Sequence, residues 1–174
     1  AREGLFSDLD AAITWHGSSM NSVRLGSGNA MNSAKFHFYG KTAHAAGDPH
    51  NGRSALDAVE LMNVGANYLR EHVITTARIH YVITEGGGQP NVVPAEAEVW
   101  YFVRAPHRSE VDEIYARLLD VAKGASLMTG TTFEENFLTG CYEVLLNESL
   151  ADVMWKCLQI VGPPEFDQED LDFA

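Results

Sequence analysis

The chain has 174 residues, of which 45% are hydrophobic and 21% charged, a composition typical of a soluble globular protein with one core. Its 24 acidic residues outnumber its 12 lysines and arginines, and the formal net charge of -12 argues against nucleic acid or an anionic membrane as a partner. No apolar run approaches the roughly 20 residues of a membrane span, and the first residues lack the pattern of a secretion signal, so we expect a cytoplasmic protein.

The chain contains two cysteines and no Cys-x-x-Cys pair, which argues against both a disulfide framework and a zinc ribbon. It begins without methionine and ends inside an acidic stretch. We therefore expect it to be a piece of a longer protein.

The first part of the chain predicts two strands and a helix. Residues 11–15 form an apolar run that indicates the end of a short buried strand. Residues 33–40 alternate between apolar and polar side chains, as in a half-buried strand. Over residues 56–73 the apolar side chains recur three or four positions apart, which indicates an amphipathic helix.

The second part predicts a strand pair, a helix and two further elements. Residues 78–84 and 96–104 flank a glycine-rich turn and are expected to pair antiparallel. Ser109 resembles the start of a capping box, and Gly130 is placed to end the helix that follows it. The remaining patterns predict a weaker strand over residues 131–138 and a helix over residues 147–161.

The order β-α-β-β-α-β between residues 33 and 138 predicts an α+β, ferredoxin-like fold, in which two helices cover one face of an antiparallel four-stranded sheet. An edge strand of such a sheet has unpaired backbone groups. One manageable outcome is a symmetric dimer in which two sheets join.

Four polar residues stand out as candidates for function. His44 lies in a loop of small residues that leave its imidazole accessible to a substrate, although a histidine that only caps the loop fits the same pattern. His16 follows the first predicted strand, where metal ligands are common, but the absence of other ligands nearby in sequence favours a hydrogen-bonded structural histidine. Asn91 follows the glycine-rich turn, Arg104 ends a strand, and both can be turn or ion-pair residues. An arginine at a strand end is also the preferred bidentate clamp for a carboxylate.

The remaining histidines show no spacing typical of a metal site. We interpret them as solvated surface or loop side chains: His37, His50, His72, His80 and His107.

Three segments, in this order, resemble the lid-domain signatures of the aminoacylase/carboxypeptidase metallopeptidase family, and within it the amidohydrolase branch. They are GKTAHAA at residues 40–46, GGGQPNVVP at residues 86–94 and EVWYFVR at residues 98–104. Residues 8–16 resemble the catalytic-domain strand that ends in a metal-binding histidine. The resemblance therefore covers nearly the whole chain.

The resemblance implies a division of the chain into three parts. Residues 33–139 would be a lid and dimerisation domain, residues 1–32 would end the first segment of an α/β catalytic domain, and residues 140–174 would begin its returning segment. It also implies a homodimer formed through the lid domain.

The resemblance further implies a reaction and roles for the four candidate residues. Two divalent metal ions, zinc or manganese, would activate a water that hydrolyses an amide of an acyl- or aroyl-amino acid of the aminobenzoyl-glutamate kind. His16 would be one metal ligand, and His44 would act in the partner subunit's site as the donor to the oxyanion. Asn91 and Arg104 would hold the carbonyl and carboxylate of this small-molecule substrate. The other metal ligands and the general base match nothing in the 174 residues, so we expect the chain alone to be inactive.

Two alternatives remain open at this point. The chain can be a free-standing ferredoxin-like module that binds a small ligand or acts in assembly, or it can belong to an N-acyl-amino-acid amidohydrolase with a different acyl specificity. The residues quoted above do not distinguish the acyl group.

Overall fold

The computed structural model describes residues 3–23, 26 and 28–173. It divides into two compact units, one of residues 26–146 and one built from the two ends of the chain. The first unit contains the whole sheet and is described first.

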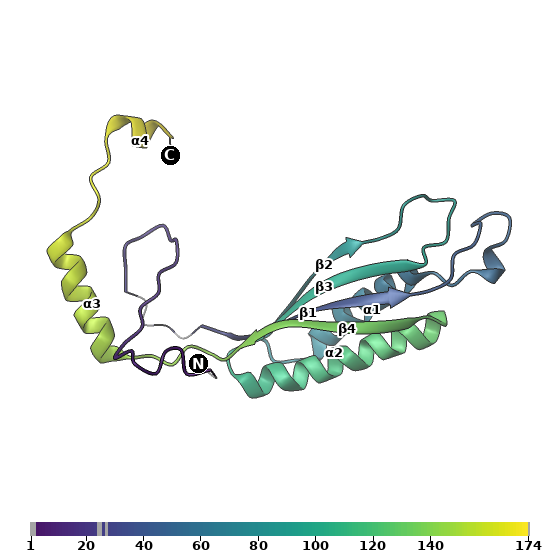
Figure 1. The fold of residues 1–174 in the computed structure, drawn as a ribbon, viewed down its shortest axis with the longest axis horizontal. Helices are drawn as coiled ribbons and strands as arrows, with labels where there is room; N and C mark the ends of the chain where they lie inside the picture. Colours follow the sequence, from purple (N-terminus) through teal and green to yellow (C-terminus); the bar gives the residue numbers. More distant parts are fainter. Residues whose placement is uncertain (1–2, 24–25, 27, 174) are drawn as a thin grey trace. The chain divides into compact units, whose positions relative to one another are not determined.

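Residues 26–146 form a four-stranded antiparallel sheet with two helices on one face (Figure 1). The strand order is β2-β3-β1-β4, and the order of elements along the chain is the predicted β-α-β-β-α-β. The predicted α+β fold class is therefore confirmed. The elements are β1 (Ala30–Tyr39), α1 (Ala55–Leu69), β2 (Arg78–Glu85), β3 (Glu96–Ala105), α2 (Arg108–Thr129) and β4 (Thr132–Cys141).

The two central strands, β1 and β3, pair without interruption from Ala30 opposite Ala105 to Tyr39 opposite Glu96. Because side chains alternate across a strand, every second residue of each strand points to the helices. Those residues form the middle of the core and are fully buried: Ala34, Phe36, Phe38, Ala97, Val99, Tyr101 and Val103. The other face of the sheet carries polar and aromatic side chains, and we call it the open face.

The two long helices begin and end where side chains and glycine allow. The Ser54 hydroxyl accepts a hydrogen bond from the Asp57 amide at the start of α1. At the start of α2 the predicted capping residue was wrong: the helix begins after His107, whose amide donates to the Glu110 carboxylate at 2.9 Å. Ser109 already lies inside the first turn, because Glu110 can reach back only to the residue three positions before it. Gly130 ends α2 with a positive φ of 65°, as predicted.

The predicted strand over residues 11–15 is absent, because these residues have no regular structure and are exposed. A strand needs a neighbour for its backbone hydrogen bonds, and within the described residues the sheet contains only β1 to β4. The predicted helix over residues 147–161 is confirmed. It is α3 (Glu148–Val161), which begins after Asn147, whose side chain accepts a hydrogen bond from the Leu150 amide.

The remaining helical elements are short. They are η1 (Pro49–Asn51), η2 (Arg70–His72) and α4 (Gln168–Phe173). Neither α3 nor α4 buries a side chain. Within the described residues no helix is both long enough and apolar enough to cross a lipid bilayer.

One buried hydrogen bond joins α1 to the sheet and provides a test of this packing. The Tyr101 hydroxyl on β3 donates to the side-chain oxygen of Asn63 on α1, and both residues are buried. We predict that Tyr101→Phe lowers the free energy of unfolding by about 1–3 kcal/mol, because it leaves the buried Asn63 oxygen without a donor. Urea denaturation measures the change. Tyr68→Phe, at a tyrosine of α1 that is 72% exposed, is the matched control. Equal small effects of the two substitutions would contradict the prediction.

Candidate functional site

His44 and Asn91 lie side by side, because the loop after β1 and the turn before β3 are held together by backbone pairing. His44 and Val92 form an isolated antiparallel bridge. Next to it the Ala45 amide donates to the Asn91 carbonyl at 2.9 Å, and the Val93 amide donates to the carbonyl of Ala43, also at 2.9 Å. Two candidates that are 47 positions apart in sequence therefore share one end of the sheet.

Gly40 is the root of the loop that carries His44. Its amide donates to the Ala95 carbonyl at 2.6 Å. The first and last residues of the loop, Lys41 and Arg53, exchange two backbone hydrogen bonds of 2.8 Å. A Cβ atom at position 40 would lie 2.0 Å from the Arg53 carbonyl oxygen. Only glycine fits this crossing without a shift of the backbone.

The imidazole of His44 is exposed, and its Nδ1 accepts two backbone hydrogen bonds, from Ala46 at 3.2 Å and from Gly47 at 2.9 Å. Backbone amides can only donate, so in the neutral ring the proton has to be on Nε2. The loop thus presents an Nε2–H donor to the outside. The ring therefore orders the loop, and its other nitrogen is directed away from these two amides.

Arg104 lies far from His44 and Asn91 within one chain. It is exposed near the end of β3, whereas Asn91 precedes the start of that strand. The eight steps from Glu96 to Arg104 span about 26 Å at the rise of an extended strand. Its guanidinium lies over the Phe102 ring, 5.3 Å from the centroid, and Arg78 is its neighbour across the β2–β3 pair. The structure therefore brings together two of the three predicted lid residues and separates the third.

His16 is exposed, and its Nδ1 lies 2.8 Å from the Gly17 carbonyl oxygen. Because a carbonyl can only accept, Nδ1 is the protonated nitrogen and the lone pair of Nε2 is free to bind a metal ion. Within the described residues no other metal-binding side chains gather around it.

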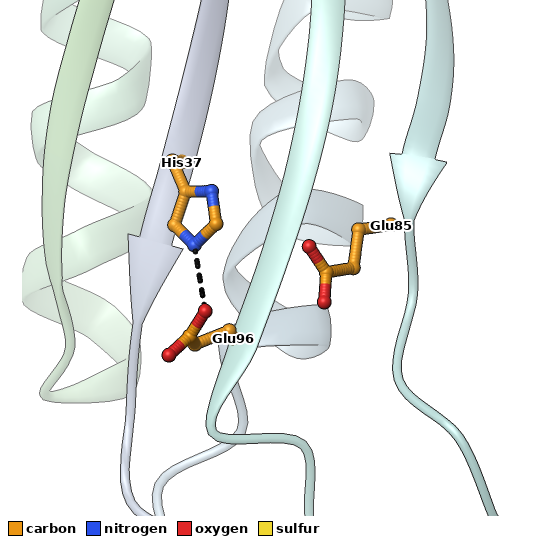
Figure 2. Close-up of side chains that lie close together, drawn as sticks. All are labelled: His37, Glu85 and Glu96. Carbon is orange, nitrogen blue, oxygen red and sulfur yellow. Dashed lines mark ion pairs between the residues drawn. The ribbon is translucent and has the colours of Figure 1, made fainter.

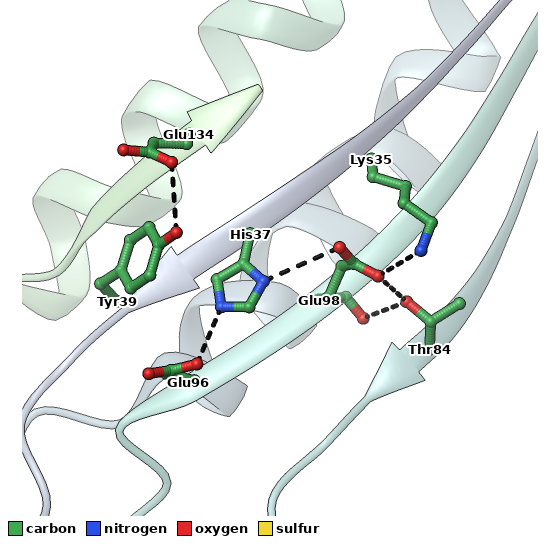
Figure 3. A network of polar contacts seen from close by, with 7 residues as sticks. All are labelled: Lys35, His37, Tyr39, Thr84, Glu96, Glu98 and Glu134. Carbon is green, nitrogen blue, oxygen red and sulfur yellow. Dashed lines mark hydrogen bonds and ion pairs between the residues drawn. The ribbon is translucent and has the colours of Figure 1, made fainter. Parts of the chain in front are cut away.

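A polar cluster on the open face was not found from the sequence. It contains His37 of β1, between the carboxylates of Glu96 and Glu98 of β3 (Figure 3). The side chain of His37 is only 22% exposed, so its interpretation as a solvated histidine was wrong. Around it lie Lys35, Tyr39, Thr84 and Glu134. The alternating polar residues of the two strands were visible in the sequence, but their pairing was not.

Glu98 is the best-satisfied acid of this cluster. Its Oε1 accepts hydrogen bonds of 2.7 Å from the Lys35 ammonium and from the Thr84 hydroxyl. Burial raises the pKa of the Glu98 carboxyl, but the hydrogen bonds from these two donors outweigh burial and leave the pKa below its ordinary value. The charged form of Glu98 is therefore favoured, and one of its two oxygens is already occupied by these donors. Within the described residues, the one group of three side chains able to hold a metal ion is His37, Glu85 and Glu96.

Comparison with known proteins gives a family match over the sheet unit. The model of the M20 peptidase dimerisation domain matches residues 26–127. The chain is 48% identical over 174 residues to a p-aminobenzoyl-glutamate hydrolase subunit of Escherichia coli (strain K12), covering 99% of this chain and 36% of that protein. It is 33% identical over 168 residues to the Xaa-Arg dipeptidase of Mus musculus, covering 96% of this chain and 38% of that protein. The chain thus spans little more than a third of the length of these relatives.

Solved structures share the fold. An aminobenzoyl-glutamate utilization protein from Klebsiella pneumoniae has a TM-score of 0.65 at 23% identity, over 77% of this chain and 34% of that one. An amidase of the hydantoinase/carbamoylase family from Burkholderia vietnamiensis has a TM-score of 0.68 at 14% identity, over 78% of this chain and 33% of that one. At these identities the similarity supports the architecture alone.

The hydrogen bonds of His44 and His16 predict opposite neutral tautomers. We expect His44 to carry its proton on Nε2 and His16 to carry its proton on Nδ1. Two-dimensional ¹H–¹⁵N spectra of the ring nitrogens, recorded at alkaline pH where imidazoles are neutral, distinguish the two forms. Gly47→Pro, which removes one of the two amides that donate to His44, should raise the share of the other tautomer. A protonated Nδ1 in unaltered His44 would refute the prediction.

Proposed function

Because the chain belongs to the family of M20 peptidase dimerisation domains, we propose that it is the lid part of a metal-dependent amidohydrolase that cleaves the amide of an acyl- or aroyl-amino acid. Residues 33–139 would be the lid, and residues 1–32 and 140–174 would belong to the catalytic domain. Family membership argues against the alternative of a free-standing small-ligand module.

The observation that carries this proposal is the fixed Nε2–H donor of His44 beside Asn91. Hydrolysis of an amide develops negative charge on the carbonyl oxygen, and a donor that is already oriented stabilises this charge without reorganisation. Loss of one such donor typically costs about 2.7–4 kcal/mol of transition-state stabilisation. The two backbone amides that hold Nδ1 supply this orientation for His44. Asn91 would hold the substrate carbonyl next to it.

Arg104 would bind the substrate carboxylate, but not together with His44 of the same chain. About 26 Å of strand separates the two ends of β3, which is more than a small substrate spans. A two-fold dimer resolves this difficulty if the β2 edges of two copies pair antiparallel, because the His44 end of one copy then lies at the Arg104 end of the other. We propose that His44 and Asn91 serve the partner subunit's site and that Arg104 serves its own.

The exposed side chains favour β2 over β4 as the dimer edge. Val82 and Ile83 on β2 are 53% and 40% exposed, and α1 beside this strand exposes Val64 and Tyr68. The opposite edge, β4, exposes Phe137 and Leu138 to a similar extent but carries adjacent acids at positions 134 and 135. Both edges have an irregular register, at residues 83–85 of β2 and at residues 137–139 of β4. Charges keep an edge strand from pairing, so the two adjacent acids of β4 favour β2 as the dimer edge.

Only part of a metal site is present. A pair of bound divalent ions, zinc or manganese, would supply an activated water and polarise the amide carbonyl. His16 fits the role of one ligand, since its Nε2 lone pair is free, whereas a site of this kind needs about four ligands. The chain alone is therefore expected to be inactive.

The relatives give two substrate directions for the same chemistry. The bacterial relative is named as part of a p-aminobenzoyl-glutamate hydrolase, and the mouse relative as an Xaa-Arg dipeptidase. The 48% identity to the former favours an aroyl-glutamate as the substrate, and an N-acyl-amino acid with another acyl group is the second candidate.

The state of the cysteines supports the reducing cytoplasm as the compartment, because both are free and exposed thiols.

The proposed β2 edge can be tested with the 174-residue chain. Val82 lies near the middle of β2, so in an antiparallel β2–β2 pair it lies close to Val82 of the second copy. We expect Val82→Lys to weaken dimerisation by at least roughly ten-fold, because it places two like charges where apolar side chains met. Sedimentation equilibrium measures the association. Leu138→Lys, on the β4 edge, is the matched control, and a dimer disrupted by this control alone would place the interface on the other edge.

The assignment of residues to the two subunits' sites predicts a pattern of complementation in the full-length enzyme. The variants His16→Ala, His44→Ala and Arg104→Ala should each be nearly inactive as homodimers. After free subunit exchange about half of the dimers are hybrids, and one intact site per hybrid returns about a quarter of the wild-type activity. We expect this recovery for His44→Ala mixed with either of the other variants.

The third mixture is the internal control. His16→Ala and Arg104→Ala damage one site each when both residues act in their own subunit, so this mixture should stay inactive. Subunit exchange is verified separately by mass spectrometry of the intact dimers. Recovery in this third mixture would refute the assignment of Arg104, and no recovery in the other two would refute the role of His44 in the partner's site.

A further inference from the structure

The open face of the sheet contains a group of side chains with the composition of a metal site. His37 comes from β1, Glu96 from the start of β3 and Glu85 from the end of β2 (Figure 2). One nitrogen or oxygen atom of each lies within 4.8 Å of the other two. Figure 2 shows the carboxylate of Glu85 turned toward the other two side chains.

The nitrogen of His37 that faces this group has no hydrogen-bond partner. Nε2 is fully removed from solvent, and within the described residues it makes no hydrogen bond. Glu96 is its nearest acid, with Oε2 at 3.3 Å, but not in hydrogen-bond geometry. A buried polar atom without a partner is costly, and an unplaced ion is one of its ordinary explanations.

The two carboxylates are free to act as ligands. Among the described residues no group donates a hydrogen bond to the carboxylate of Glu85 or Glu96, and the ion pair of Glu96 is with His37 itself. Glu98, in contrast, is occupied by Lys35 and Thr84, so it belongs to the surroundings of the site. The cluster has four carboxylates against one lysine, because Glu134 lies beside Tyr39 on the same face. This excess of negative charge favours a cation.

The distances suit a small divalent ion. Two ligand atoms bound at about 2.0–2.1 Å in a tetrahedral arrangement lie about 3.4 Å apart. The 3.3 Å between His37 Nε2 and Glu96 Oε2 already has this value. Glu85 is exposed at the end of its strand and lies within 4.8 Å of the other two ligand atoms, so it has to approach by at most about 1.4 Å, which a side-chain rotation provides.

We propose that His37, Glu85 and Glu96 bind a divalent transition-metal ion, with Zn²⁺ as the best match to one imidazole and two carboxylates. The ion would connect the ends of three strands. Since β1 leads into the His44 loop and β3 follows the Asn91 turn, it would stiffen the end of the sheet that carries both residues. The site involves only residues of the sheet unit and does not depend on His16 or on the proposed reaction.

The test is a titration of the untagged 174-residue chain with Zn²⁺ in a calorimeter. We expect one ion per chain, bound at least roughly ten-fold more weakly by both His37→Gln and Glu85→Gln, since even the loss of an outer-shell partner typically costs ten-fold. Two controls should bind like the wild type. His80→Gln removes an exposed histidine from β2, and His16→Ala removes the other candidate ligand. Thermal unfolding with Zn²⁺ should show a higher midpoint for the wild type and no shift for the two site variants.

Circular dichroism shows whether the variants fold. If His37→Gln does not fold, Glu85→Gln still decides the question, because Glu85 is exposed and contributes nothing to the core. Three results would overturn the proposal. These are no binding at about 100 µM free Zn²⁺, a weak regime for a protein zinc site, binding that persists unchanged in Glu85→Gln, and binding that His16→Ala abolishes.

Discussion

The pairing of β1 with β3 over ten residues is the constraint on which the rest of the domain depends. One face of this pair supplies the middle of the core, and the other face holds the cluster around His37. Its length also separates the two ends of the sheet, so that His44 and Arg104 cannot reach one small substrate from the same chain. The proposed site therefore requires residues from two copies of the chain.

Local patterns in the sequence were sufficient for the fold, because periodicity, turn glycines and caps act over a few residues. Gly130 ended its helix as predicted, and Asn147 capped the next one. The prediction was wrong where an element depends on a neighbouring strand that is distant in sequence. Residues 11–15 have the composition of a buried strand, but no described strand pairs with them. The capping residue of α2 was misplaced by two positions, because Glu110 selects the residue three before it rather than the nearest serine.

The candidate site shows the same division between local and distant information. The loop of small residues marked His44, and the turn marked Asn91, but only the bridge between His44 and Val92 shows that the two belong together. His37 was missed because its neighbours in space are 48 and 59 positions away, at Glu85 and Glu96. Such a group is brought together by the register of the paired strands, which cannot be read from the spacing of its residues along the chain.

The crossing at Gly40 has a consequence for how the loop after β1 can be altered. The loop from residue 41 to residue 53 closes on itself by backbone hydrogen bonds at its root, and only glycine fits between that root and the Arg53 carbonyl. The root is a fixed frame, whereas Pro49, His50 and Asn51 at the tip are exposed and have no role in the proposed site. New specificity can therefore be sought by varying these three residues, provided that Gly40, the His44 segment and the two strand ends are kept.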